Sequence, residues 1–296
     1  MTAGVENWTV GTSARRPVGA RVQRRLEVGG RYLVLLLASA AVLAPVFWML
    51  SSALRPSDEL FVVPVRLLPD TFTFEAFVQV WVETGLARNV LNSLLVVTGS
   101  TAVAVVFTSL SAYGLSRYEF RGKGTFLTFL LVTQMFPAIM LLIPYFQIVR
   151  SIGLYDSYGA LIITYTAFAV PFCTWMLYGY MKSIPRDLDE AAMLDGCSPF
   201  GAFWRIVLPL ARPGVIATAI FSFITGWNEY IFALALVNSQ DLRTLPVMLG
   251  LLAGNDALDW NAIMAASVVA VVPMIIIFGF FQRHLVSGLG AGAVKG

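Results

Sequence analysis

Long hydrophobic runs separated by polar segments are the main pattern along the chain. Each run is close to the roughly 20 residues that an α-helix needs to cross a hydrocarbon layer about 30 Å thick. Because lipid offers the backbone no hydrogen-bond partner, we expect these runs to be helical. The pattern therefore predicts an all-α polytopic membrane protein with six transmembrane helices, at Leu33–Ala53, Val90–Tyr113, Phe126–Val149, Tyr158–Met181, Val215–Val237 and Ile263–Gln282.

The predicted spans contain, among others, the prolines Pro137, Pro144, Pro171 and Pro273. A proline removes one backbone hydrogen bond and bends a helix. In a membrane, neighbouring helices can cover the carbonyl that the proline frees. We therefore expect these prolines to kink their spans without ending them.

The composition agrees with a protein whose surroundings are lipid. The chain has 296 residues, of which 58% are hydrophobic and 12% are charged, whereas soluble domains carry about 25% charged residues. The first run is too long for a cleaved signal peptide, which favours an uncleaved span. Two isolated cysteines and one histidine predict neither a disulfide framework nor a metal site.

The basic residues predict the orientation of the spans. Fifteen of the 20 lysines and arginines lie in the N-terminal segment, in the loops after the second and fourth spans, and in the C-terminal tail. The positive-inside rule places these segments, and both termini, in the cytoplasm. The expected organisation is a basic cytoplasmic tail over residues 1–30, a transmembrane domain over 31–285 and a cytoplasmic tail over 286–296.

One long charged loop, residues 182–213, separates the fourth and fifth spans. Asp187 and Glu190 have the spacing of a capping box at the start of a short helix. Gly196 is suited to a left-handed turn after that helix. Ser198 followed by Pro199 then predicts the start of a second short helix. The charged loop is therefore expected to form a helix, a glycine turn and a second helix in the cytoplasm.

The small and charged side chains of this loop favour contact with another protein. Ala191 and Ala192 let a partner surface approach closely, and Glu190 and Asp195 supply charge at the rim of the contact. The alternative is an amphipathic helix that rests on lipid headgroups. The two acidic residues, with few cations nearby, argue against that alternative.

The stretch "EAAMLDGCSPFGAFWRIVLPLARPG" resembles the EAA loop in the membrane subunits of bacterial ABC importers. Two further stretches, "WNEYIFALAL" at Trp227–Leu236 and "GLGAGAVKG" at Gly288–Gly296, are similar to the sugar-type permeases of the MalG class. The resemblance runs from Leu33 to the C-terminus. The residues that match the loop pattern are Glu190, Ala191, Ala192, Asp195, Gly196 and Pro209.

This resemblance implies a set of partners and a location. The permease domain would pair with a second permease in the bacterial inner membrane, above two cytoplasmic ATP-binding subunits and below an extracytoplasmic solute-binding protein. The EAA loop would sit in a cleft on an ATPase and convert ATPase closure into rocking of the spans. No nucleic acid is expected as a partner, and ATP and Mg²⁺ would be bound by the ATPase subunits.

The chain itself is expected to bind no cofactor and to have no catalytic residues. A P-loop needs the pattern GxxxxGK[ST]. The nearest stretch, "RGKG" at Arg121–Gly124, lacks the first glycine and the terminal hydroxyl residue. We interpret it as a basic cytoplasmic turn.

Polar residues inside the spans are candidates for a solute pathway, because their exposure to lipid is costly. Glu229 is predicted to lie in the outer half of the fifth span, and Trp227 and Asn228 beside it could stack on and hydrogen-bond a carbohydrate. Gln134, just before Pro137, is a second candidate. The alternatives are a structural network around Glu229 and simple packing at the Gln134 kink.

The sequence therefore favours a permease subunit for a sugar. Glycerol-phosphate or another polyol is the alternative solute within the same family. A secondary transporter that works without ATP is a different class, but it would leave the charged loop unexplained, and Glu229 has no evident cationic partner inside the membrane.

Overall fold

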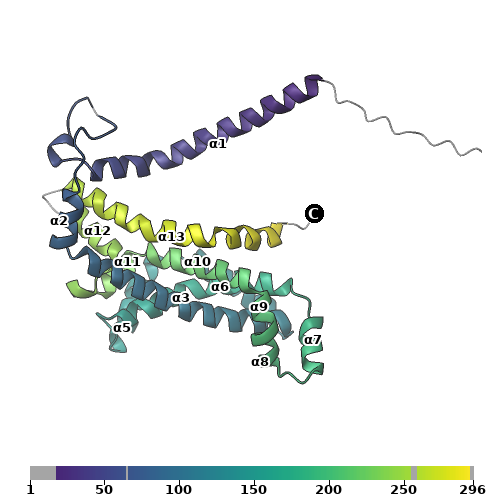
Figure 1. Cartoon of the computed structure of the whole chain (residues 1–296). Coiled ribbons are helices and arrows are strands. Elements are labelled where there is room, and N and C mark those ends of the chain that lie inside the picture. The colour runs from purple at the N-terminus through teal and green to yellow at the C-terminus, as the bar shows by residue number, and fades with distance from the viewer. Residues whose placement is uncertain (1–17, 65, 255–258, 294–296) are drawn as a thin grey trace, which may run out of the picture. The chain divides into compact units, whose positions relative to one another are not determined.

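The computed structural model describes residues 18–64, 66–254 and 259–293, and within these ranges the chain folds into helices and turns with no strand (Figure 1). The chain divides after Met49 into two units. The first unit contains most of helix α1 (Val18–Ala53), whose apolar side chains from Tyr32 to Leu37 are exposed. Exposed apolar side chains on a long helix are what a lipid-facing segment requires.

The second unit is a helical bundle. Helix α3 packs most extensively against α6, and α10 packs against α3, α6 and α13. The helices of this unit after the end of α1 are α2 (Glu75–Glu83), α3 (Leu86–Arg117), α4 (Lys123–Met135), α5 (Leu142–Ser151), α6 (Tyr158–Lys182), α7 (Asp187–Leu194), α8 (Pro199–Ala202), α9 (Leu208–Leu210), α10 (Arg212–Trp227), α11 (Ile231–Leu236), α12 (Leu245–Ala253) and α13 (Trp260–Ala293).

Four helices in the described residues are long and apolar enough to cross a membrane by themselves, within α1, α3, α6 and α13. Two bent pairs pass the same test together, one containing α4 and α5 and the other containing α8, α9 and α10. If each bent pair is one span, the total is the six that the hydrophobic pattern predicts. The predicted all-α membrane fold is confirmed.

The third predicted span is not a kinked helix, and here the sequence-based prediction is wrong. Helix α4 ends at Met135, a 3-10 turn follows at Ala138–Leu141, and the two halves are bent by 93°. Phe136 is extended, with φ −79° and ψ 127°. A residue before proline is pushed out of the helical region by the proline ring, so Pro137 ends α4.

The fifth predicted span is also interrupted. Helix α10 ends at Trp227, and α11 begins at Ile231. Asn228 and Glu229 lie in the break between them, so Glu229 is not part of a continuous span. The break gives the Glu229 carboxylate access to backbone N–H groups that a continuous helix would use itself.

The predicted tails are partly helical. Helix α1 begins at Val18, inside the predicted tail 1–30, and α13 continues to Ala293, inside the predicted tail 286–296. Residues 1–17 and 294–296 lie outside the described part of the chain. The boundaries of the transmembrane domain at 31 and 285 therefore fall within helices.

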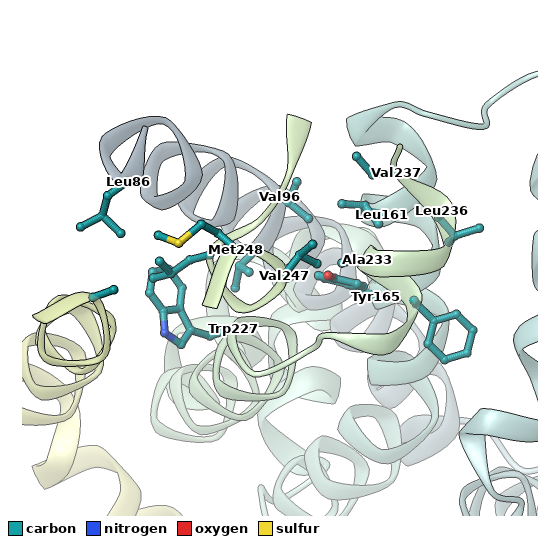
Figure 2. Close-up of a cluster of buried hydrophobic side chains, with 14 of the residues drawn as sticks. Leu86, Val96, Leu161, Tyr165, Trp227, Ala233, Leu236, Val237, Val247 and Met248 are labelled. Carbon is teal, nitrogen blue, oxygen red and sulfur yellow. The ribbon is translucent and has the colours of Figure 1, made fainter. Parts of the chain in front are cut away.

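The main hydrophobic cluster joins α3, α6, α10, α11 and α12 (Figure 2). Helices α2, α11 and α12 lie at one end of the bundle, and α7, α8 and α9 lie at the opposite end (Figure 1). At the first of these ends, the side chains of Asn89 and Asn92 donate to the carbonyl of Arg243 and fix the start of α12 to α3. The charged loop is thus at the end opposite this polar junction.

Candidate coupling loop and solute pathway

The first helix of the charged loop begins one residue earlier than a capping box would place it. Arg186 is the N-cap residue of α7, and no side chain caps the helix. Asp187 is the first helical residue, so the predicted capping box is wrong. Arg186 already has helical angles, φ −70° and ψ −26°, which moves the Asp187 carboxylate past the capping position. The acidic residues of this turn still stabilise the helix, because their negative charges lie at the positive end of the helix dipole.

The rest of the predicted loop geometry is confirmed. Gly196 has φ +89°, a left-handed angle that a glycine adopts at little cost. The Ser198 hydroxyl accepts a hydrogen bond from the Gly201 N–H at 3.1 Å, and Pro199 begins α8. A π-helix at Phe203–Val207 and then α9 lead to a bend of 77° before α10.

The loop presents one face outward and one face to the bundle. Glu190, Ala191, Asp195 and Gly196 are exposed. Ala192 is buried, so it packs against the bundle rather than forming part of the outward face with Ala191. Pro209 is exposed near the entry to α10.

A large apolar side chain adds to the outward face. Leu194, the last residue of α7, is 90% exposed. Sequence reasoning did not select Leu194, although a leucine beside a glycine turn in a charged loop was a visible signal. An apolar side chain this exposed outside the spans is a candidate contact for another protein.

A buried ion pair fixes the inner face of α7. The Arg117 Nε lies 2.8 Å from the Asp189 Oδ2, and the two side chains are 7% and 6% exposed. The Tyr113 hydroxyl lies 3.2 Å from the Asp189 Oδ1. Sequence reasoning missed this set, because it treated Arg117 only as a cytoplasmic positive charge.

A second ion-pair network, centred on the exposed Glu119 carboxylate, lies beside the buried one. The Glu119 carboxylate pairs with Lys123 at 2.9 Å and with Arg186 at 3.0 Å. Hydrogen bonds from Lys123 and then Arg186 lower the pKa of Glu119. Exposed pairs of this kind contribute little to stability because water screens them.

The solute-pathway candidates fall into two groups. The Glu229 carboxylate accepts hydrogen bonds from the N–H groups of Phe232 at 2.9 Å and Ala233 at 3.0 Å, so it caps the start of α11. Asn228 is exposed beside it, and its side-chain amide donates to the Ile224 carbonyl.

Trp227 has a different environment from its two neighbours. It is 4% exposed and lies among the apolar side chains of the main cluster (Figure 2). Its indole N–H donates to the Ala270 carbonyl at 3.2 Å, which links α10 to α13. A direct contact between Trp227 and a solute would require the indole to leave this packing.

Gln134 lies in the last turn of α4, directly before the right-angle break, and it is exposed.

The part of the chain that the structure describes contains no group of three or more histidine, cysteine or acidic residues that could hold a metal ion. The features that stand out are therefore an outward-facing loop at one end, fixed by a buried ion pair, and polar residues at two helix breaks.

Comparisons with known proteins agree with this arrangement. Residues 104–290 match the family model described as binding-protein-dependent transport system inner membrane component. The sulfoquinovosyl glycerol transport system permease protein SmoH of Agrobacterium fabrum is 39% identical over 86% of this chain and 89% of its own length. The trehalose transport system permease protein SugB of Mycobacterium tuberculosis is 36% identical over 86% and 93%. The trehalose/maltose permease protein MalG of Thermococcus litoralis is 35% identical over 92% and 99%.

Solved structures share the fold. A chain from the crystal structure of a bacterial ABC transporter involved in import of the acidic polysaccharide alginate has a TM-score of 0.75, at 23% identity, and the match covers 92% of this chain and 99% of that one. The family model covers more than half of the chain, and the relatives match along most of their length. The chain belongs to the family of binding-protein-dependent transport system inner membrane components, and it is a membrane-spanning permease of an ABC transporter.

Proposed function

We propose that the chain is one of two permease subunits in an ATP-driven importer for a sugar, and that it works with two ATP-binding subunits and an extracytoplasmic solute-binding protein. The observation that carries this proposal is the similarity, along most of the chain, to permeases whose names include sulfoquinovosyl glycerol, trehalose and maltose. The family match over residues 104–290 spans the charged loop and both helix breaks.

The charged loop is the proposed contact with an ATPase subunit. Its outward face combines the carboxylates of Glu190 and Asp195 with the small side chain of Ala191 and the exposed Leu194. An apolar anchor within a polar rim is the usual composition of a protein contact. Gly196 and Pro209 would set the course of the chain on either side of that contact.

ATP and Mg²⁺ would be bound by the ATPase subunits. In this proposal, the chain itself contributes no catalytic residue. The conformational change that ATP drives in the ATPase subunits would reach the spans through the charged loop. The exposed acidic residues in the first turn of α7, Asp187 and Glu190, point to a basic or hydrogen-bond-donating surface on the ATPase.

The proposed solute path passes the two helix breaks. Hydrogen-bond donors and acceptors for the hydroxyl groups of a sugar would come from Gln134, Asn228 and Glu229. The packed indole of Trp227 would fix the position of the neighbouring Asn228 and Glu229. Irregular backbone at membrane depth is tolerated where it is buried in protein or lines a water-filled cavity.

The test begins with purification of the affinity-tagged chain from its own membrane. We expect a second permease and an ATPase to purify with it. In proteoliposomes, ATP hydrolysis should rise when the binding protein is added together with its sugar. A thermal-shift panel of sugars, polyols and glycerol phosphate on the purified binding protein would identify the solute class.

The same experiment can contradict the proposal. Purification of the chain without any ATPase, together with uptake driven by an ion gradient, would indicate a secondary transporter instead. Stabilisation of the binding protein by glycerol phosphate or a polyol, and by no sugar, would replace the proposed solute while leaving the ATP-driven mechanism intact.

A further inference from the structure

The inner face of α7 is joined to the spans through a buried triad, which we define as Tyr113, Arg117 and Asp189. Arg117 is the last residue of α3, and its guanidinium pairs with the Asp189 carboxylate at 2.8 Å. Both side chains are at most 7% exposed. Removal of one partner from a buried pair leaves an uncompensated charge, so the two elements that carry such a pair separate only at a high cost.

Arg117 also holds the end of α6. Its Nη1 donates to the carbonyl of Met181 at 3.3 Å and to the carbonyl of Ile184 at 3.1 Å. The last carbonyls of a helix have no partner within the helix, and a guanidinium satisfies them well. One side chain therefore connects three elements: α3, the end of α6, and α7.

Tyr113 extends the same junction to the second half of the charged loop. Its hydroxyl lies 3.1 Å from the Pro199 carbonyl as well as 3.2 Å from the Asp189 carboxylate, and it can donate to either. Its ring packs against Phe203, with 4.9 Å between the ring centroids. The triad thus contacts both sides of the Gly196 turn.

The connection to α10 is of a different kind. The chain reaches α10 through the π-helix at Phe203–Val207 and a bend of 77°. In the described ranges of the chain, no ion pair joins α7 or α8 to α10. A π-helix is a weaker, locally irregular element that often occurs at functional positions.

We propose that Tyr113, Arg117 and Asp189 are positioning residues that make α7 move as one body with α3 and α6. A force on the charged loop would then reach α3 and α6 directly through the triad. It would reach α10 without such an ion pair, through the π-helix and through the packing of α10 against α3 and α6. This inference rests on the proposed function, because that function supplies the force from an ATPase.

The test measures whether α7 and α3 keep one distance during ATP binding. Spin labels are placed by Leu188→Cys on α7 and Leu110→Cys on α3, both exposed positions outside the proposed ATPase contact, after Cys173 and Cys197 have been replaced by serine. Distance distributions are recorded for the assembled complex without nucleotide and with ATP and vanadate. This readout needs no knowledge of the solute.

We expect the wild-type triad to give the same distribution in both nucleotide states. Asp189→Asn keeps the side-chain size but removes the charge, and it should broaden the distribution and shift it when ATP binds. The matched control is Glu119→Gln, which removes the ion pairs that the 68% exposed Glu119 carboxylate makes with Arg186 and Lys123. That control should behave like the wild-type protein, because these pairs are screened by water.

Two results would overturn the inference. One is a wild-type distance that changes on ATP binding, and the other is an Asp189→Asn distribution identical to that of the wild-type protein. If Asp189→Asn does not assemble, Tyr113→Phe removes a single hydroxyl and keeps the ring, and a wild-type distribution in that variant would count against the triad. An absence of ATPase subunits in the purified wild-type complex would contradict the proposed function instead, which is a separate outcome.

Discussion

The angle at Gly196 sets the direction in which the charged loop turns between α7 and α8. Its φ of +89° is accessible to glycine, whereas any other residue except asparagine or aspartate adopts left-handed angles at a clear cost. No atom lies within 4 Å of a Cβ added at this position, so the cost of a substitution comes from the backbone and not from a clash.

We expect Gly196→Ala to impair transport while the subunit still inserts and assembles. The alanine adds about 1–2 kcal/mol of strain to the turn, enough to shift the geometry of the proposed ATPase contact. Transport per assembled complex is the measurement, and Gly196→Asn is the control, because asparagine tolerates the left-handed region. Wild-type transport in Gly196→Ala at normal expression would exclude the assigned role of the turn.

Glu229 is expected to have two measurable effects at once. Glu229→Gln leaves one carbonyl oxygen where two carboxylate oxygens held the N–H groups of Phe232 and Ala233, so α11 should lose about 1 kcal/mol of stabilisation. If Glu229 also lines the solute path, transport per assembled complex should change as well.

Thermal stability and transport are measured on one preparation of Glu229→Gln. Asn228→Ala is the control for stability, since the Asn228 side chain does not bond to α11. Unchanged transport per complex in Glu229→Gln would show that Glu229 is not part of the proposed solute pathway and that its role is to cap α11.

At the scale of single residues, the sequence predicts those structural features that depend only on residues close by in the chain. Gly196 and the Ser198 cap were predictable because both follow from local backbone requirements. The buried triad was not, since Tyr113 and Asp189 are 76 positions apart and only the packing of α3 against α7 brings them together.

The packing of α10 against α6 depends on a glycine. A Cβ added at Gly214, in the first turn of α10, would lie 2.7 Å from the Tyr180 ring of α6. That distance is too short for two carbon atoms, and the ring packs against the hydrophobic cluster that includes Phe203 and Val207. The two helices would have to separate to admit a methyl group.

Gly214→Ala should therefore destabilise the subunit by about 1–3 kcal/mol, the usual cost of overpacking. The melting temperature of the detergent-purified complex measures the effect. Gly179→Ala on α6 is the matched control, because nothing lies within 4 Å of a Cβ at that position. Equal melting temperatures for the two variants would show that α10 does not depend on this close approach.

The helices themselves were largely predictable, and their interruptions were not. Hydrophobic length alone identifies segments that lipid requires to be helical. Whether Pro137 bends a helix or ends it depends on what surrounds the freed backbone groups, which a single sequence does not contain. The break at Glu229 was unpredictable for the same reason. Its carboxylate accepts hydrogen bonds from two backbone N–H groups, and in a continuous helix backbone carbonyls would accept those hydrogen bonds instead.

The orientation of the whole molecule in the membrane is predicted by charge and can be measured by labelling. In a background without Cys173 and Cys197, a Gly201→Cys variant should react only with reagent on the cytoplasmic side, and an Asp70→Cys variant only from outside. The fifteen basic residues on one side motivate this expectation. The reverse labelling pattern would overturn the orientation and the docking of the charged loop with it.

The bend between α4 and α5 has a consequence for how the membrane protein is made. Helix α4 has 13 residues and α5 has 10, lengths of about 20 Å and 15 Å at 1.5 Å per residue. Neither is sufficient by itself for a hydrocarbon layer of about 30 Å. The backbone at the bend must also be shielded from lipid by protein.

During synthesis, this shielding forms only after the bent pair has left the ribosome. Helix α4 packs against α6, and α5 packs against α11, and both α6 and α11 follow the bent pair in the sequence. A chain truncated after Ser151 should therefore leave the third span accessible to protease in membrane vesicles, whereas a chain extended through Leu236, which contains both α6 and α11, should protect it. Equal protection of both truncated chains would contradict this order of events. The right-angle break makes biogenesis of the third span depend on helices that have not yet been translated.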